Sequence, residues 1–154
     1  MTAADFHLIT EWRLNAPIDA VWHALTEVEA WPGWWRAVRR VELLEPGDAG
    51  GIGSLRRMTW RTALPYSLSF DMRTTRIEHH RVIEGRAGGE LDGTGRWTLW
   101  EEADGTYVRY DWIVEVSKPW MRLVAPLLRP VFAWNHEVVM KWGLAGLKGK
   151  LGLT

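Results

Sequence analysis

The chain has 154 residues, 19 basic and 19 acidic side chains, and no cysteine. A net charge of zero argues against a protein that binds the nucleic-acid backbone, because such proteins carry an excess of Lys and Arg. Without cysteine the chain has no disulfide, no thiolate nucleophile and no sulfur-ligated metal, and its length suits one domain over residues 1–154.

The N-terminal part predicts a strand followed by two short helices. Residues 1–6 lack the basic and apolar regions of a secretory signal, so we expect a cytoplasmic protein. Apolar and polar side chains alternate over residues 6–15, which is typical of a strand with one buried face. Asn15 is placed to cap a short helix with Pro17 in its first turn. The Trp-Pro-Gly-Trp-Trp sequence at 31–35 predicts a break with a second short helix around it.

From residue 38 to residue 116 the pattern predicts about six consecutive antiparallel strands. Turns are expected at the glycine-rich segment 46–51 and at 78–80. The clearest hairpin lies at Asp104-Gly105, since this dipeptide favours a turn whose twist matches the strands. Its second arm has five alternate apolar positions, which indicates a sheet with one wet face.

The apolar period then changes from two to 3.6, and a long helix is expected from Ser117, as its cap, to about Gly149. Pro126 and Pro130 each remove a backbone hydrogen bond and should bend the helix, convex toward solvent. The longest apolar stretch, 120–134, contains two arginines and two prolines and is not expected to span a bilayer. The inner face of the helix is expected to carry Val124, Leu128, Val131, Phe132, Asn135, Val138, Val139 and Trp142.

These elements predict an α+β fold: a curved antiparallel sheet of about seven strands wrapped around a long C-terminal helix, with two short helices after the first strand. The chain also contains twelve tryptophans, more than a core of this size needs. Aromatic walls with a few polar groups are typical of a pocket for an apolar small molecule. The alternative is that the indole rings fill the core completely.

Four segments resemble a known superfamily: residues 15–22, 31–35, 50–53 and 132–140. They resemble the helix-grip fold of START domains and birch-pollen-allergen proteins (SRPBCC), and within it the polyketide cyclase/dehydrase-like branch. The resemblance implies a deep cavity between sheet and long helix that holds lipids, sterols, polyketides or other aromatic ligands. The superfamily includes carriers, cyclases and regulators, so it leaves the activity open.

The long helix carries the most informative polar cluster. Asn135 interrupts the apolar inner stripe, so it either binds a ligand or ties the helix to a strand backbone. His136 has an unperturbed pKa of about 6.5, which suits acid–base catalysis, although a lone helical histidine is also common as a structural residue. Glu137 is expected to face solvent and pair with Lys141. Met140 occupies the second ligand position of a His-Glu-x-x-His motif, so we expect no metal site.

Charged residues in the strands determine how polar the cavity is. Arg56 shares its parity with Trp60 and is expected to face inward, as are Glu84 and Arg86 by their parity with Val82. Inward charges should pair with each other or with a ligand anion, because an unpaired buried charge is costly. The alternative is a bulge that turns these side chains to water.

Our leading hypothesis is a protein that binds an apolar, aromatic or lipid-like small molecule and needs no cofactor. The residues expected to line its cavity are Trp12, Arg56, Trp60, Phe70, Glu84, Trp97, Tyr110, Trp112, Phe132, Asn135, Val139 and Trp142. A second hypothesis is a polyketide cyclase- or dehydratase-like enzyme in which His136 moves a proton and Arg56 or Asn135 stabilises an oxyanion. A third is a membrane- or partner-docking module that uses the mildly basic, amphipathic residues 141–154.

Overall fold

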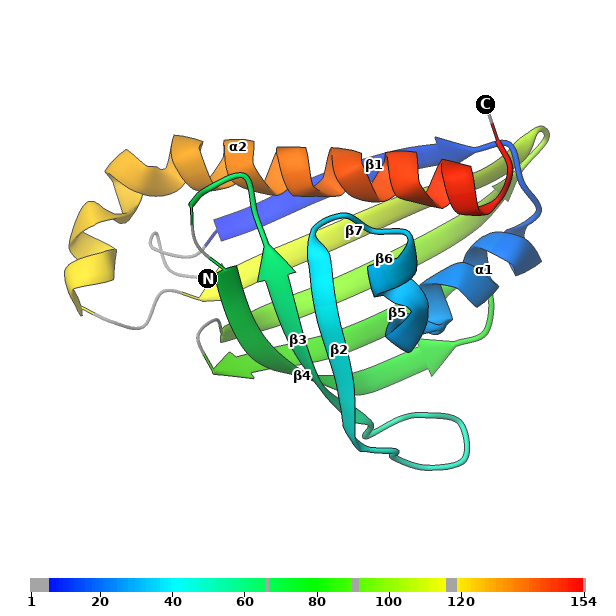
Figure 1. The fold of residues 1–154 in the computed structure, drawn as a ribbon, viewed down its shortest axis with the longest axis horizontal. Coiled ribbons are helices and arrows are strands. Elements are labelled where there is room, and N and C mark those ends of the chain that lie inside the picture. The colour runs from blue at the N-terminus through cyan, green and yellow to red at the C-terminus, as the bar shows by residue number, and fades with distance from the viewer. Residues whose placement is uncertain (1–5, 66, 90–91, 116–118, 154) are drawn as a thin grey trace.

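The computed structural model describes residues 6–65, 67–89, 92–115 and 119–153. Its elements follow one another as the strand pattern and the later helical pattern predict (Figure 1). They are β1 (Phe6–Leu14), α1 (Ile18–Thr26), the 3₁₀ helix η1 (Val28–Gly33), β2 (Val38–Glu45), β3 (Leu55–Arg61), β4 (Ser67–Glu78), β5 (Val82–Gly89), β6 (Asp92–Glu102), β7 (Gly105–Glu115) and α2 (Pro119–Lys150).

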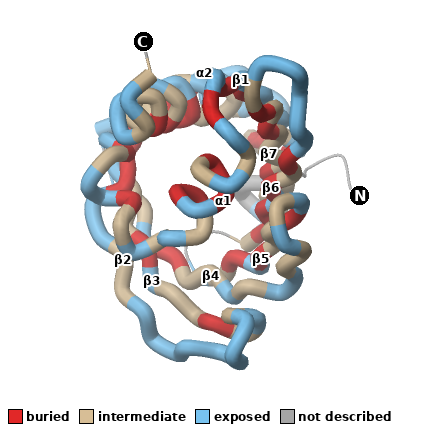
Figure 2. Tube along the Cα trace, turned by 90° about the vertical axis from the view of Figure 1, so that its right-hand side faces the viewer, coloured by how far each residue is buried: buried red, intermediate tan, exposed pale blue. Residues whose placement is uncertain are grey.

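The strands form one antiparallel sheet in the order β1-β7-β6-β5-β4-β3-β2. Each strand from β2 to β6 pairs with the next one along the chain, and β1 pairs with β7. The sheet curves around the interior, with α2 across its open side (Figures 1 and 2). The predicted α+β helix-grip architecture is therefore confirmed.

The first strand and helix show how the local pattern produces these elements. Phe6, Trp12 and Leu14 are buried on one face of β1, Leu8 and Thr10 on the same face are half-buried, and the alternate residues are exposed, as the alternation predicts. The prediction that Asn15 caps α1 is wrong, because the helix begins at Ile18 with Pro17 at the cap position. The chain needs the intervening residues to turn away from the sheet before helical hydrogen bonds can start.

The predicted hairpin at Asp104-Gly105 is confirmed, and β6 and β7 pair along their whole length. Gly105 has a φ of 150°, and a Cβ at this position would overlap the carbonyl oxygen of Leu14 at the end of β1. The neighbouring Thr106 hydroxyl donates a 2.8 Å hydrogen bond to the carbonyl of Ala16. The turn between β6 and β7 therefore holds the segment between β1 and α1 in place against the sheet.

Helix α2 bends in its first turns, and its convex side faces away from the sheet (Figure 1). Pro126 and Pro130 lie inside the helix and are exposed, in agreement with the predicted bend. The prediction that Val131 faces inward is wrong: the side chain is exposed, because this half of the helix extends past the sheet. The predicted cap, Ser117, lies outside the described residues. No helix in the described part of the chain is long and apolar enough to cross a membrane.

The second half of α2 packs against the core. Leu147 is completely buried, and Leu144 and Leu151 pack on the same cluster. The apolar side chains that made residues 141–154 a candidate membrane-docking segment therefore contact the protein itself. Gly146 lies where the helix crosses Trp34, whose carbonyl oxygen would overlap a Cβ at that position.

Candidate functional site

A cavity of about 350 Å³ lies between the concave face of the sheet and α2. Rings from β3, β4, β6, β7 and α2 form much of its wall. Ten of the residues predicted for the site line it, namely Arg56, Trp60, Phe70, Trp97, Tyr110, Trp112, Phe132, Asn135, His136 and Val139. The alternative that tryptophans fill the interior completely is therefore wrong.

Sequence reasoning missed the part of the wall contributed by η1 and the residues after it. Trp31 and Trp35 line the cavity and lie 5.2 Å apart, between ring centroids. Their indole N–H groups donate to the carbonyls of Ala24 and Val139, which fixes both rings. The sequence does show tryptophans on both sides of a Pro-Gly break, which could have suggested a role for them in the site. The pattern does not predict where this break lies relative to the sheet.

Small residues on the inner face leave room for the large ones. Gly95 faces the cavity from β6, and a Cβ there would lie 2.5 Å from the hydroxyl oxygen of Tyr110. The Tyr110 ring can therefore lie flat against the strand, 4.3 Å from the Trp97 ring between centroids. The glycines of β5 and β6 thus widen the space that the aromatic side chains enclose.

Two predicted lining tryptophans lie elsewhere. Trp12 is buried in the core between the rings of Trp35 and Trp97, at centroid distances of 5.9 and 5.3 Å. Trp142 packs against the core, and the guanidinium of Arg36 lies 4.4 Å from its ring centroid. Both predictions of cavity contact are wrong. A side chain that faces the interior of the protein can lie either at the cavity wall or in the packed core beside it, and the sequence pattern does not distinguish the two.

The prediction that Glu84 and Arg86 face the cavity is also wrong. Glu84 pairs with Arg96 at 3.2 Å, and Arg86 pairs with Glu115 at 2.7 Å, on the outer side of the sheet. The inner positions of β5 hold Ile83 and, after it, only glycine and alanine. Those small residues do not continue a hydrophobic alternation, so the prediction followed the parity of the buried valine that precedes Ile83 and assigned the wrong face.

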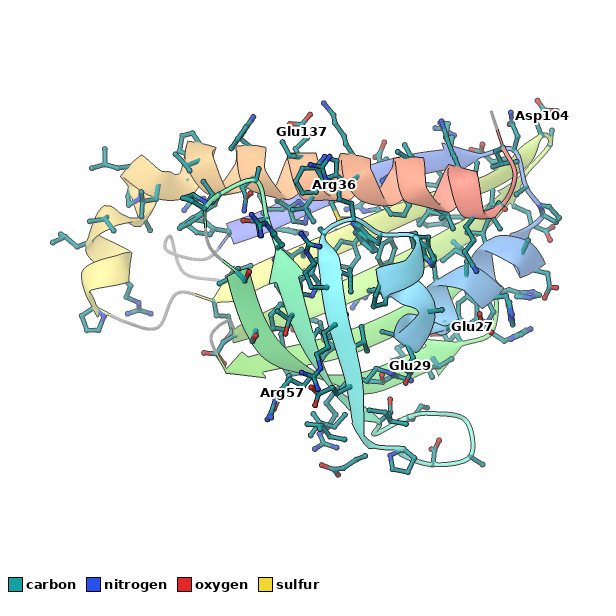
Figure 3. The ribbon with its side chains drawn as sticks, in the orientation of Figure 1. Glu27, Glu29, Arg36, Arg57, Asp104 and Glu137 are labelled. Atoms are coloured by element: carbon teal, nitrogen blue, oxygen red, sulfur yellow. The ribbon has the colours of Figure 1, made fainter. Side chains whose placement is uncertain are left out.

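Arg56 faces inward, as predicted, and it is already paired. Its Nε donates a 2.8 Å hydrogen bond to Glu29 of η1, and Nη1 donates one of 3.0 Å to the hydroxyl of Ser54. The Arg56 side chain is 18% exposed. Glu29 reaches it from the short helix on the opposite side of β2 (Figure 3). This ion pair places charge at the wall of a mainly apolar cavity, which Asp92 and Glu115 also line.

Asn135 lies at the cavity wall and is buried. Its Oδ1 accepts a 2.9 Å hydrogen bond from the backbone N–H of Ala63, in the loop after β3. The amide therefore ties α2 to the sheet, which is the structural role considered for it. Glu137, two positions later, points away from the sheet (Figure 3) and pairs with Lys141 at 3.2 Å, as predicted.

His136 and Trp60 carry buried nitrogens with unused hydrogen-bonding capacity. The Nε2 of His136 and the Nε1 of Trp60 have no hydrogen-bond partner among the described residues. The imidazole is nearly parallel to the Tyr110 ring, at a centroid distance of 6.3 Å. Burial lowers the pKa of His136 to about 4, so the imidazole is neutral at neutral pH. Burial also raises the pKa of Tyr110, which keeps its hydroxyl protonated.

This arrangement suits an uncharged ligand with one or two polar atoms. The aromatic rings offer flat apolar surface, and a neutral imidazole, a phenol and an indole N–H offer hydrogen bonds without charge. Among the described residues, no group of three His, Asp or Glu side chains lies close enough to hold a metal ion.

Comparison with known protein families gives one match. Residues 14–139 match the family described as polyketide cyclase/dehydrase and lipid transport. A search of curated protein sequences gave no match.

Several solved structures share the fold at low sequence identity. The Zhui aromatase/cyclase from Streptomyces sp. R1128 is 18% identical, with a TM-score of 0.73 over 95% of this chain and 93% of its own. TTHA0849 from Thermus thermophilus is 16% identical, with a TM-score of 0.76 over 94% of this chain and 99% of its own. The ginseng major latex-like protein 151 from Panax ginseng is 15% identical, with a TM-score of 0.63 over 86% of this chain and 99% of its own.

Proposed function

Because the chain belongs to the polyketide cyclase/dehydrase and lipid transport family, we propose that it binds an apolar small molecule, aromatic or lipid-like, in the cavity between the sheet and α2. The observation that carries this proposal is the aromatic wall around about 350 Å³ of space. A cavity of this size falls in the range of small-molecule sites. Burial of the ligand would supply most of the affinity, at about 25 cal/mol per Å² of apolar area less the cost of ordering.

The polar groups at the wall favour a ligand that carries a hydroxyl or carbonyl oxygen. His136 and Tyr110 are both uncharged at neutral pH and lie side by side at the cavity. An uncharged polar pair binds a neutral oxygen without the desolvation cost that a charged group would add. Arg56 is less suited to a ligand anion, because Glu29 already occupies its Nε.

Native mass spectrometry after incubation with fatty acids, sterols and aromatic polyketides tests the proposal. We expect a discrete added mass for at least one class and saturable binding by calorimetry. Tyr110→Phe should weaken a hydroxylated aromatic ligand about fivefold, since one hydrogen bond contributes about 1 kcal/mol. Tyr107→Phe is the matched control, because Tyr107 packs on Trp100 away from the cavity. A bare mass with every class would overturn the proposal.

An enzyme remains a second candidate, and His136 is the residue that favours it. Its imidazole is buried at the cavity wall with Nε2 unpaired among the described residues, and one structural neighbour is an aromatase/cyclase. A pKa of about 4 makes the imidazole a weak base, since efficient acid–base groups titrate near the working pH. In an enzyme, His136→Ala would abolish turnover while weakening ligand binding only by about one hydrogen bond, roughly fivefold. In a carrier it would weaken binding by the same amount, and there would be no turnover to lose.

A further inference from the structure

The charged side chains at the cavity wall bear on the charge of its ligand. Among the described residues that line the cavity, Arg56 is the only lysine or arginine, and Asp92 and Glu115 are the acidic residues. A ligand anion would be repelled by the two carboxylates and would have to bind through Arg56. The existing partners of Arg56 therefore decide whether the cavity can hold an anion.

Arginine binds a carboxylate most strongly through two parallel hydrogen bonds, and this protein shows two ways of making them. Arg57 donates from Nε and Nη2 to the two carboxylate oxygens of Asp71, at 2.9 and 3.2 Å. Arg86 donates from Nη1 and Nη2 to the two oxygens of Glu115, at 2.7 and 2.9 Å. A guanidinium thus offers two edges to a carboxylate, and Nη2 belongs to both.

At Arg56 each of these edges is already partly occupied. Nε donates a 2.8 Å hydrogen bond to Glu29, and Nη1 donates one of 3.0 Å to the hydroxyl of Ser54. Ser54 is buried, and its hydroxyl also lies 3.0 Å from that of Thr74, so it is held in place. A ligand carboxylate could form two parallel bonds only by displacing Glu29 or Ser54. A single uncharged oxygen needs only one N–H of Nη2.

Glu29 also neutralises the charge of Arg56. The Arg56 side chain is 18% exposed, so water screens the ion pair only in part. A second carboxylate on the same guanidinium would lie close to that of Glu29, and like charges repel more strongly where water is excluded. A carbonyl, amide or hydroxyl group on the ligand avoids this repulsion.

We propose that Glu29 is a specificity-determining residue: by binding Arg56 it excludes carboxylates from the cavity and favours uncharged ligands that carry a carbonyl, amide or hydroxyl group. This inference rests on the proposed function, because it concerns the ligand of the same cavity. It assigns the choice of ligand charge to a side chain of η1 that reaches the wall only through Arg56.

Calorimetry of the intact protein with two matched pairs of probes tests the proposal: naphthoic acid with naphthamide, and lauric acid with lauramide. At neutral pH the acids are ionised and the amides are uncharged. We expect the wild type to bind at least one amide, and the corresponding acid about tenfold more weakly or less. Glu29→Gln should bind that acid about tenfold more tightly than the wild type does, because a neutral amide leaves Arg56 its positive charge and releases Nε more readily. Its affinity for the uncharged probe should stay within about twofold.

Glu27→Gln is the matched control, and both glutamates are labelled in Figure 3. The Glu27 side chain is exposed to the same extent as that of Glu29 (46% and 44%), but it pairs with His23 of α1 at 3.0 Å. This variant should bind both probes as the wild type does. Adding Arg56→Gln to Glu29→Gln should remove the gain in affinity for the acid.

Four results would overturn the proposal: a wild type that binds acid and amide equally, an equal gain with Glu27→Gln, a gain for both probes of a pair, or a gain that persists without Arg56. If the amides bind and Glu29→Gln leaves the affinity for the acids unchanged, this inference fails and the cavity proposal stands. If no probe binds any of the variants or the wild type, both fail together.

Discussion

The polar side chains at the cavity differ in how much of their hydrogen-bonding capacity the protein uses. Arg56 is satisfied by Glu29 and Ser54, and Asn135 accepts a bond from the backbone of Ala63. His136 Nε2 is buried without a partner among the described residues. A buried polar group left unpaired costs about 1–3 kcal/mol. The imidazole therefore lowers the stability of the ligand-free protein, and a ligand can recover that energy.

The pKa of His136 predicts how stability depends on pH. Its folded-state pKa, about 4, lies below the ordinary 6.5, so the unfolded chain binds more protons between these values. The free energy of unfolding should therefore fall by up to about 3 kcal/mol as the pH drops from 6.5 to 4, and this contribution should not change further below that. Urea denaturation across this pH range measures the change.

The variant His136→Leu isolates this contribution from those of the carboxylates. It should be more stable than the wild type at pH 7 by about 1–2 kcal/mol, because it removes an unpaired polar group and keeps apolar volume. The difference between the two proteins should widen between pH 6.5 and pH 4. A constant difference across that range would show that His136 does not titrate as its burial requires.

At the scale of elements, α2 crosses closely over the segment that follows η1, and glycines of the helix permit this close approach. Gly143 lies against the Trp35 ring, where a Cβ would be 2.6 Å from a ring carbon, and Gly146 lies against the Trp34 backbone. Leu147, next to this contact, is completely buried. Glycine is unfavourable inside a helix, so its presence here reflects the space that the crossing needs.

Alanine at two glycines of α2 should have opposite effects. Gly146→Ala should destabilise the protein by about 3 kcal/mol or more, because the new methyl group would overlap backbone that cannot move as a side chain does. Gly149→Ala meets no atom within 4 Å and should stabilise the helix by up to about 1 kcal/mol. Urea denaturation of both variants checks this. Equal effects would mean that helix propensity, and not the crossing, sets the cost.

For the whole molecule, the curved sheet and the long helix enclose a space that neither would form alone. The sheet bends from β1 to β2 around the interior, and α2 covers its open side (Figure 2). The rings of Trp31 and Trp35 enter from the short helical segment between β1 and β2. A ligand bound in that space would contact sheet, helix and this segment together and would stabilise all three.

Ligand binding should therefore raise the thermal stability of the whole chain. A cavity ligand at about one hundred times its Kd should add about 2.7 kcal/mol to the free energy of unfolding. For a chain of this length the Tm should rise by about 5–10 °C. Calorimetry of wild type and Tyr110→Phe checks this, and Tyr110→Phe should show a smaller rise at equal ligand concentration. A retained ligand that leaves the Tm unchanged would place the binding site outside the cavity.

The sequence by itself determined the order and type of the elements, because burial on one face imposes a period of two on strands and 3.6 on helices. It also identified most of the aromatic rings in the cavity wall, among them Trp60, Phe70 and Phe132, because they lie on inner faces that are apolar in the sequence pattern.

Only the tertiary structure decided which inward-facing side chains border the cavity and which strand residues face outward. On the inner face of β5 only Ile83 is large and apolar, and the glycine and alanine that follow it carry no hydrophobic signal, so the alternation did not show that Glu84 faces outward. Trp12 and Trp142 are aromatic like the residues of the wall, but Trp12 lies in the core and Trp142 packs against it. Whether an inward ring borders a cavity or another ring depends on contacts between segments far apart in the chain, which local periodicity does not contain.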